Sequence, residues 1–284
     1  MISVLNLGRC DYATALRLQE TLVELRKQNR IGNALLLVEH PPVITLGRNA
    51  HASNIVVSRE LLASQGVEIH EINRGGDVTF HGPGQLVAYP IFDLRSFEPK
   101  LGVIEYVRRL EDVLMRICAQ YAIESQRIAG MTGVWTYPTP PPRLNPRQMG
   151  RDYIPAGENS AETSLYSERK LAAIGVHVSR GVTSHGFALN VTTDLDFFKL
   201  IVPCGLTKPV TSIEFETGLR PSLDEVMTLA SRRFGELFHS QMLWLESIHD
   251  LIPAESVEPP TPQDIPARAP ENERRIASDD IHLV

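Results

Sequence analysis

The chain has 284 residues, of which 43% are hydrophobic and 22% are charged, and its formal net charge is −6. This composition supports one large globular domain with a sizeable core, and the negative charge argues against a nucleic-acid-binding protein. Because no apolar segment approaches the ~20 residues that cross a bilayer, and the start of the chain has no secretory pattern, we expect a cytoplasmic protein with neither nucleic acid nor a membrane as a partner.

The first half of the chain alternates helical and strand patterns. Apolar residues at helical spacing predict a surface helix over 12–29 and a long amphipathic helix over 103–121. Pro41 and Pro42 mark a break between two strands, because proline cannot donate a hydrogen bond to a ladder. Strands are predicted over 34–40, 43–47, 67–74, 85–94 and 133–137, with the glycine-rich residues 75–84 as a connection.

The middle of the chain contains a segment without a regular pattern. Residues 138–164 are rich in proline and lack periodicity, which predicts an irregular surface insertion. Order resumes with the runs KLAAIGVHV and HGFALNVTT. Residues 212–216 predict a half-buried strand, because Ile213 and Phe215 alternate with polar neighbours.

A last helix and a tail complete the chain. Ser222 and Glu225 have the spacing of a capping box, and the helix that they begin is expected to end near Leu245. Residues 251–284 are acidic and proline-rich, which predicts a disordered tail after a domain that covers residues 1–250. The interleaved helices and strands predict an α+β fold with a mixed sheet and packed helices.

The densest polar motif is RGGDVTFHGPGQ, which runs from Arg74 to Gln85. Its glycines allow the backbone to approach a ligand closely, and its polar side chains supply donors at the same place. It matches neither a P-loop nor a dinucleotide-binding glycine pattern. On its own, the motif fits a binding rim and an ordinary glycine-rich hairpin turn about equally well.

The three cysteines, Cys10, Cys118 and Cys204, are an odd number and lie far apart, so we expect neither a disulfide framework nor a metal site. Cys204 lies between a proline and a glycine, which is typical of an accessible turn. A nucleophile fits there, although a small buried hydrophobic residue is the more common role for a free cysteine. A reactive thiol needs a base or a cation beside it, and the candidates are His81, His185 and Lys170.

Three blocks of the sequence together resemble the lipoyl(octanoyl) transferases: RGGDVTFHGPGQLVAYPIFDL, KLAAIGVHVSRGVTSHGFALNV and VPCGL, in the order and spacing of that family. The resemblance implies the fold shared with biotin and lipoate protein ligases. It implies that Cys204 carries an octanoyl thioester, that Lys170 lowers the pKa of the thiol and acts as acid and base, and that no cofactor is needed. The residues that it implies at the substrate are Arg74, Gly75, Gly76, Asp77, Val78, Thr79, Phe80, His81, Ala173, Ile174, Gly175, Gly186, Phe187 and Ala188.

The reaction that this resemblance implies is the first step of endogenous protein lipoylation. An octanoyl group would pass from octanoyl-acyl carrier protein to a lysine of a lipoyl domain, in a 2-oxoacid dehydrogenase or the glycine cleavage H protein.

The insertion and the tail depart from the family pattern. Three arginines of the insertion, Arg143, Arg147 and Arg151, are a hypothetical docking site for one of these acidic partners.

Three alternative functions remain open from the residues alone. An ATP-dependent lipoate or biotin protein ligase would release pyrophosphate from ATP and free acid. A non-catalytic module that binds lipoyl domains would show no transfer. A cysteine hydrolase that pairs Cys204 with His81 or His185 would cleave a thioester without an amine acceptor.

Overall fold

The computed structural model describes residues 1–137, 168–202, 208–252 and 280–283. Within these residues the main sheet contains β1 (Ile2–Arg9), β2 (Asn33–Glu39), β6 (Gln85–Ile91), β7 (Ser125–Ile128), β8 (Met131–Thr136), β9 (Lys170–Ser179), β10 (Val182–Asn190), β11 (Met242–Trp244) and β12 (Asp280–Leu283). The strand order is β11-β1-β2-β6-β10-β9-β8-β7, with β12 also paired to β9. The pairs β1–β11 and β1–β2 are parallel, whereas β2–β6, β6–β10 and β9–β10 are antiparallel, so the sheet is mixed.

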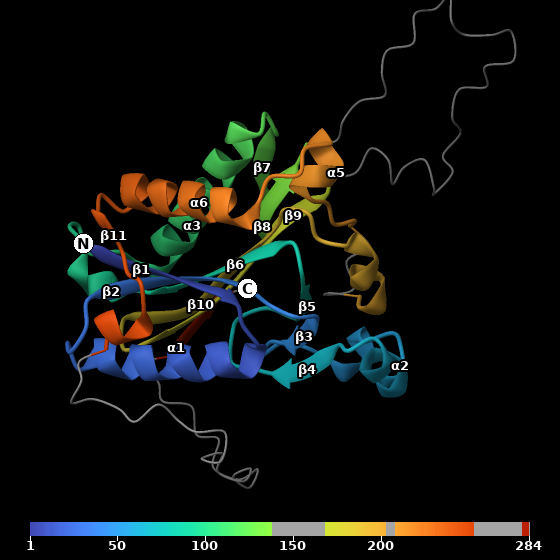
Figure 1. Ribbon diagram of the computed structural model, residues 1–284, viewed down its shortest axis with the longest axis horizontal. Helices are drawn as coiled ribbons and strands as arrows, with labels where there is room; N and C mark the ends of the chain where they lie inside the picture. Colours follow the sequence, from blue (N-terminus) through green and yellow to red (C-terminus); the bar gives the residue numbers. More distant parts are fainter. Residues whose placement is uncertain (138–167, 203–207, 253–279, 284) are drawn as a thin grey trace, which may run out of the picture.

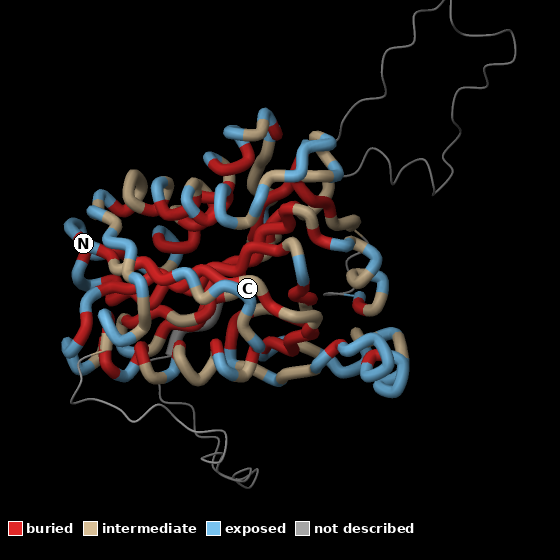
Figure 2. The backbone as a smooth tube through the Cα atoms, in the orientation of Figure 1, coloured by how far each residue is buried: buried red, intermediate tan, exposed pale blue. Residues whose placement is uncertain are grey.

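Helices cover both faces of this sheet, as Figure 1 shows. Helix α1 (Tyr12–Lys27) covers one face, and α3 (Val103–Gln120) and α6 (Leu223–Leu237) cover the other. Strand β2 shows the reason: Leu35 and Leu37 belong to the core under α3 and α6, whereas Leu36 and Val38 belong to the core under α1. The central strands β2, β6, β9 and β10 are therefore buried along most of their length (Figure 2). The predicted α+β fold with a mixed sheet is confirmed.

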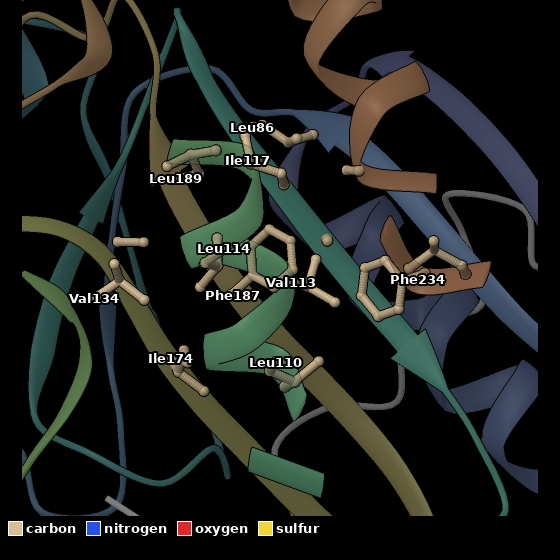
Figure 3. Close-up of a cluster of buried hydrophobic side chains, with 14 of the residues drawn as sticks. Leu86, Leu110, Val113, Leu114, Ile117, Val134, Ile174, Phe187, Leu189 and Phe234 are labelled. Atoms are coloured by element: carbon tan, nitrogen blue, oxygen red, sulfur yellow. The ribbon is translucent and has the colours of Figure 1, made fainter. Parts of the chain in front are cut away.

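The larger core lies between α3 and the strands that carry the candidate residues. Leu110, Val113, Leu114 and Ile117 of α3 point at β6, β9 and β10, where they meet Phe187 and other apolar side chains (Figure 3). All four helix residues lie within two turns of one face, as the amphipathic spacing predicts. Helix α3 thus packs against one face of β9 and β10 and supports these two strands.

A second, three-stranded sheet stands beside the main one. It has the order β4-β3-β5 and is formed by β3 (Val43–Leu46), β4 (Glu68–Glu71) and β5 (Val78–His81). Pro41 and Pro42 lie where the chain leaves β2 for β3, so the predicted break separates two sheets. A third core, which includes Ile44 and Phe80, holds this sheet together with α2 (Arg59–Ser64).

Several sequence-based expectations about elements are wrong. Residues 212–216 do not form a strand, because the Ser212 side chain accepts a hydrogen bond from the Phe215 amide and caps the short helix α5 (Ile213–Thr217). Phe215 is 65% exposed, so its alternation with polar residues was no sign of a buried face. The last helix ends at Leu237, well before Leu245, and β11 follows it. The glycine-rich connection contains a strand, β5.

The insertion over 138–164 and most of the predicted tail lie outside the described residues. At residues 280–283 the expectation of a disordered tail is wrong, since β12 pairs antiparallel with β9, from Asp280 opposite Ser179 to Leu283 opposite Val176. Main-chain hydrogen bonds at a sheet edge need no apolar side chains, which is why composition did not reveal this strand. In the described part of the chain, no helix is both long and apolar enough to cross a membrane.

Candidate active site

A cavity of about 340 Å³ lies where the β9–β10 hairpin faces the segment that leads into β5. Most of the residues predicted to contact a substrate line it, from all three predicted segments, and Lys170 lines it as well. Two predicted residues do not line it: the Phe80 ring stacks on Phe197 in the third core, and the Gly75 amide donates to the Val176 carbonyl of β9. Cys204 lies outside the described residues. The structure thus brings together segments that are about 100 residues apart in the sequence.

The glycines of these segments allow three stretches of backbone to meet. The Gly75 amide donates to the Val176 carbonyl at 3.0 Å and ties the glycine-rich segment to β9. A Cβ on Gly175 would lie 2.9 Å from the Gly75 carbonyl oxygen, and one on Gly186 would lie 2.1 Å from the Ala88 carbonyl oxygen. Both glycines are therefore needed because backbone lies against them, and any larger residue would push the walls of the cavity apart.

Arg74 is buried and braces the cavity wall. Its guanidinium donates to the Gly75 carbonyl at 2.9 Å, to the Thr45 carbonyl at 2.9 Å, and to the Thr45 hydroxyl at 3.0 and 3.3 Å. It therefore binds the glycine-rich segment to β3. It also places a permanent positive charge at the polar end of the cavity, which is the part of the wall that contains Asp77, Thr79 and His81.

His81 is held at the same end. Its Nδ1 lies 2.8 Å from Gln85 Oε1 and its Nε2 lies 3.5 Å from Thr45 Oγ1. Burial, and secondarily the neighbouring His40, lowers the pKa of His81 to about 3. The ring is consequently neutral at physiological pH.

His185 is the second imidazole in the cavity wall. Its backbone adopts a left-handed conformation with φ of 54°, its amide donates to Gln19 Oε1, and its Nε2 lies 2.7 Å from Asn73 Oδ1. Burial lowers its pKa to about 3, and the charge of Arg74 acts in the same direction. His185 is thus neutral as well, with Nε2 as the donor to Asn73.

Lys170 begins β9 and lies against an aromatic ring. Its Nζ is 5.0 Å from the centre of the Trp135 ring, a distance typical of a cation–π contact. Gly133, in the left-handed region with φ of 127°, leaves room for this side chain, since a Cβ there would lie 2.9 Å from Lys170 Cε. The backbone of Lys170 is fixed by bonds with Pro209 and Thr211.

The two described cysteines are poor nucleophiles. Cys118 is fully buried on α3, and burial raises the pKa of its thiol to about 12. Burial also raises the pKa of Cys10, and the nearby Asp11 adds to the effect. A thiol with a raised pKa holds little thiolate at neutral pH, so neither residue suits covalent catalysis.

Sequence reasoning does not single out three further cavity residues, Tyr12, Tyr89 and Asn190. Each sits in an ordinary position of a helix or strand pattern, so no local signal marks them. His40 contacts two of them: its ring centre lies 5.2 Å from that of Tyr12, and its Nε2 accepts from the Tyr89 hydroxyl at 2.8 Å while its Nδ1 donates to the Cys10 carbonyl at 2.7 Å. Within the described residues no group of three or more His, Cys, Asp and Glu could hold a metal ion.

Comparisons with known proteins identify the family of the chain. The family model "Lipoyl protein ligase A/B catalytic domain" matches residues 11–235. An octanoyltransferase of Koribacter versatilis is 57% identical over 284 residues, which is 100% of both chains. The chain belongs to the octanoyltransferase family. An octanoyltransferase of Acidobacterium capsulatum is 53% identical over 261 residues, covering 89% of this chain and 96% of its own. Membership of the octanoyltransferases makes the chain an acyltransferase that takes part in protein lipoylation.

Solved structures of other proteins share the fold of this chain. A crystal structure of lipoate-protein ligase A bound with ATP has a TM-score of 0.61 at 15% identity and covers 87% of this chain and 89% of that one. A bipartite lipoate protein ligase of Thermoplasma acidophilum has a TM-score of 0.59 at 14% identity, covering 87% and 88%. The expected lipoate ligase-like fold is confirmed.

Proposed function

We propose that the chain transfers an octanoyl group from octanoyl-acyl carrier protein to the target lysine of a lipoyl domain, through a thioester on Cys204. The acceptor domains would be those of 2-oxoacid dehydrogenases and the glycine cleavage H protein, in the cytoplasm, and no cofactor is required. The observation that carries the proposal is the cavity itself. Three glycine-containing segments form its walls and Lys170 stands at it.

The ends of the segment that contains Cys204 support this role. Before it, the Val202 amide donates to the Asn54 carbonyl at 2.8 Å, and the Asn54 side chain donates to Asp77 of the cavity wall at 2.6 Å. After it, Lys208 Nζ lies 5.8 Å from the same Trp135 ring that Lys170 contacts. Val202 and Lys208, which flank the segment, therefore each contact a residue that in turn contacts a cavity-lining side chain, Asp77 or Lys170.

The two cavity histidines favour Lys170 as the partner of the thiol. A hydrolase of the cysteine–histidine type needs an imidazole that takes a proton near neutral pH. His81 and His185 both have pKa values of about 3, because they are buried. A lysine ammonium can instead stabilise a thiolate by its charge.

The walls also suit the acyl chain. Val78, Ile174, Phe187 and Ala188 present apolar surface inside the cavity. Burial stabilises an alkyl chain by ~0.8 kcal/mol for each methylene, so a chain of eight carbons gains several kcal/mol.

The reaction would run in two steps. The Cys204 thiolate attacks the thioester carbonyl carbon, a new C–S bond forms, and the thiol of the carrier protein leaves with the proton that Lys170 holds. The lysine amine of the lipoyl domain then attacks the enzyme thioester, the C–N bond forms, and the C–S bond to Cys204 breaks. The amine proton returns through Lys170. Thioester exchange is nearly isoenergetic, whereas formation of the amide is downhill.

The test is to incubate the protein with octanoyl-acyl carrier protein, measure its intact mass, and then add an apo lipoyl domain. Wild type should gain one octanoyl group that the domain then acquires, whereas Cys204→Ala should gain none. Cys10→Ala is the matched control and should behave as wild type. Absence of an adduct, with modification of the domain only when ATP and free acid are supplied, would replace this proposal with the ligase alternative.

A further inference from the structure

A buried chain of hydrogen bonds determines which nitrogen of His81 carries the proton. The chain starts at the Thr211 carbonyl, which can only accept, and which receives Asn190 Nδ2 at 2.9 Å. Asn190 Oδ1 in turn accepts from Gln85 Nε2 at 2.8 Å, and the same nitrogen donates to the Phe80 carbonyl at 3.2 Å. Because the Gln85 amide nitrogen faces two acceptors, its oxygen must accept the proton on His81 Nδ1.

The other side of the ring is determined as well. With Nδ1 protonated and the ring neutral, His81 Nε2 carries a lone pair. The Thr45 hydroxyl accepts from Arg74 and can turn its own hydrogen toward Nε2, but it lies 3.5 Å away, at the outer limit of a hydrogen bond, and is therefore a weak donor to the ring. Since His81 lines the cavity, Nε2 is an acceptor with capacity for a donor brought there.

We propose that Gln85 is a positioning residue that holds His81 as the Nδ1–H tautomer, and that His81 Nε2 accepts an N–H of the acceptor lysine amine. This inference rests on the proposed function. The acyl thioester offers only acceptors and C–H groups, so it cannot satisfy Nε2. A neutral amine can, because it attacks with its lone pair and keeps its N–H groups for hydrogen bonds.

In this arrangement His81 takes no proton. The C–N bond forms, the C–S bond to Cys204 breaks, and the amine proton leaves through Lys170. A ring with a pKa of about 3 is too weak a base for that transfer at neutral pH. His81 instead orients the attacking amine. It therefore acts only in the second half-reaction, the transfer of the octanoyl group from Cys204 to the lipoyl domain.

The tautomer can be measured directly by NMR on wild-type protein labelled with ¹⁵N-histidine. Comparison with His81→Gln assigns the His81 ring signals. We expect a protonated Nδ1 and a bare Nε2 from about pH 5 to about pH 9, and a shift of the Nε2 signal when the apo lipoyl domain is added to Cys204→Ala. A protonated Nε2, a titration within this range, or an unmoved Nε2 signal would overturn the inference.

The two half-reactions test the role of Gln85. In Gln85→Glu a carboxylate beside Nδ1 favours the charged ring, and Nε2 becomes a donor. We expect acylation of Cys204 to stay within about threefold of wild type, and transfer to the lipoyl domain to fall about tenfold or more. The control is Gln65→Glu, the same change at an exposed position, which should alter neither step.

Equal losses in both half-reactions, or no loss in the second, would contradict a positioning role. Should Gln85→Glu fail to fold, the wild-type spectra still decide the tautomer and its response to the lipoyl domain. Failure of the proposed function looks different, because wild type would then acquire no octanoyl group at all, whatever the state of His81.

Discussion

The ammonium of Lys170 lies 5.0 Å from the centre of the Trp135 ring, and this contact fixes a positive charge beside the cavity. We predict that Lys170→Ala raises the pH midpoint for alkylation of Cys204 toward the ordinary ~8.5 of a free thiol, because the thiolate loses a stabilising cation. Rates of iodoacetamide labelling across pH, followed by mass spectrometry, measure this midpoint. An unchanged midpoint would show that another group activates the thiol.

Arginine at the same position separates charge from proton transfer. Lys170→Arg keeps a cation, so the thiol midpoint should remain low. Arginine does not release its proton, however, and octanoyl transfer should fall by about 100-fold. Labelling and transfer rates of the same sample provide the comparison, and parallel changes in both would argue that Lys170 acts through its charge alone.

Gly186 shows how closely the backbone segments meet. Gly186→Ala would place a Cβ 2.1 Å from the Ala88 carbonyl oxygen in the centre of the main sheet. We expect the free energy of unfolding to fall by about 3 kcal/mol or more, because backbone must move to relieve the overlap. Urea denaturation measures the loss. Gly32→Ala is the control, since its Cβ would meet no atom within 4 Å.

At the scale of elements, Glu111 of α3 ties the helix to the hairpin that supports Lys170. Its carboxylate is buried and accepts from Arg108 at 2.8 Å, from Arg127 of β7 at 2.7 Å, and from the Gly133 amide of β8 at 3.4 Å. Arg127 also donates to Asp112 at 2.6 Å and to the Arg108 carbonyl at 3.0 Å, so Glu111 is the buried member of a small polar network that joins α3 to the β7–β8 hairpin.

Removal of that carboxylate should be costly. Glu111→Ala removes the buried acceptor that Arg108 and Arg127 share and leaves the Gly133 amide without it, whereas Arg127 keeps Asp112 and the Arg108 carbonyl. We expect the free energy of unfolding to fall by about 2 kcal/mol. Glu236→Ala also removes an ion-paired carboxylate, but one that water screens, so the change should be much smaller. Equal effects in thermal or urea unfolding would contradict the special role of Glu111.

The elements also show which sequence patterns are sufficient to predict a helix or a strand. The helices α1, α3 and α6 were predictable because apolar residues recur on one face over many residues. The short helix α5 was not, since five residues allow both periods and only the Ser212 cap decides between them. Strand β5 was hidden by its glycine-rich flanks. Short segments follow their tertiary contacts more than their own pattern.

For the whole molecule, the sequence predicted the sheet class and the three segments of the cavity, but not the charge states within it. His40, His81 and His185 have pKa values of about 4, 3 and 3 because burial disfavours their charged forms. Burial depends on every layer of the fold at once. Local residue types therefore left His81, His185 and Lys170 open as candidates, the family resemblance implied Lys170, and the low pKa values of the two histidines support that proposal.

The same histidines predict how stability depends on pH. Their folded pKa values lie below the ordinary ~6.5, so below that pH the unfolded chain binds more protons, and stability falls as the pH decreases toward about 4. Each histidine should contribute a loss of roughly 1 kcal/mol between pH 7.5 and pH 5.5. Urea unfolding at both values tests this. His185→Asn should weaken the dependence, and exposed His249→Gln should leave it unchanged.

Strand β12 has a consequence for the solution behaviour of the protein. It pairs with the part of β9 from Val176 to Ser179, directly after the part of the same strand that lines the cavity. Unpaired strand edges are templates on which a second copy of a chain can add its own strand. A chain cut before Asp280 would lose the backbone partner of this part of β9 and expose such a template. It should self-associate more strongly than the full chain as its concentration rises in sedimentation experiments, because the pairing of β12 with β9 prevents a second copy from adding a strand there.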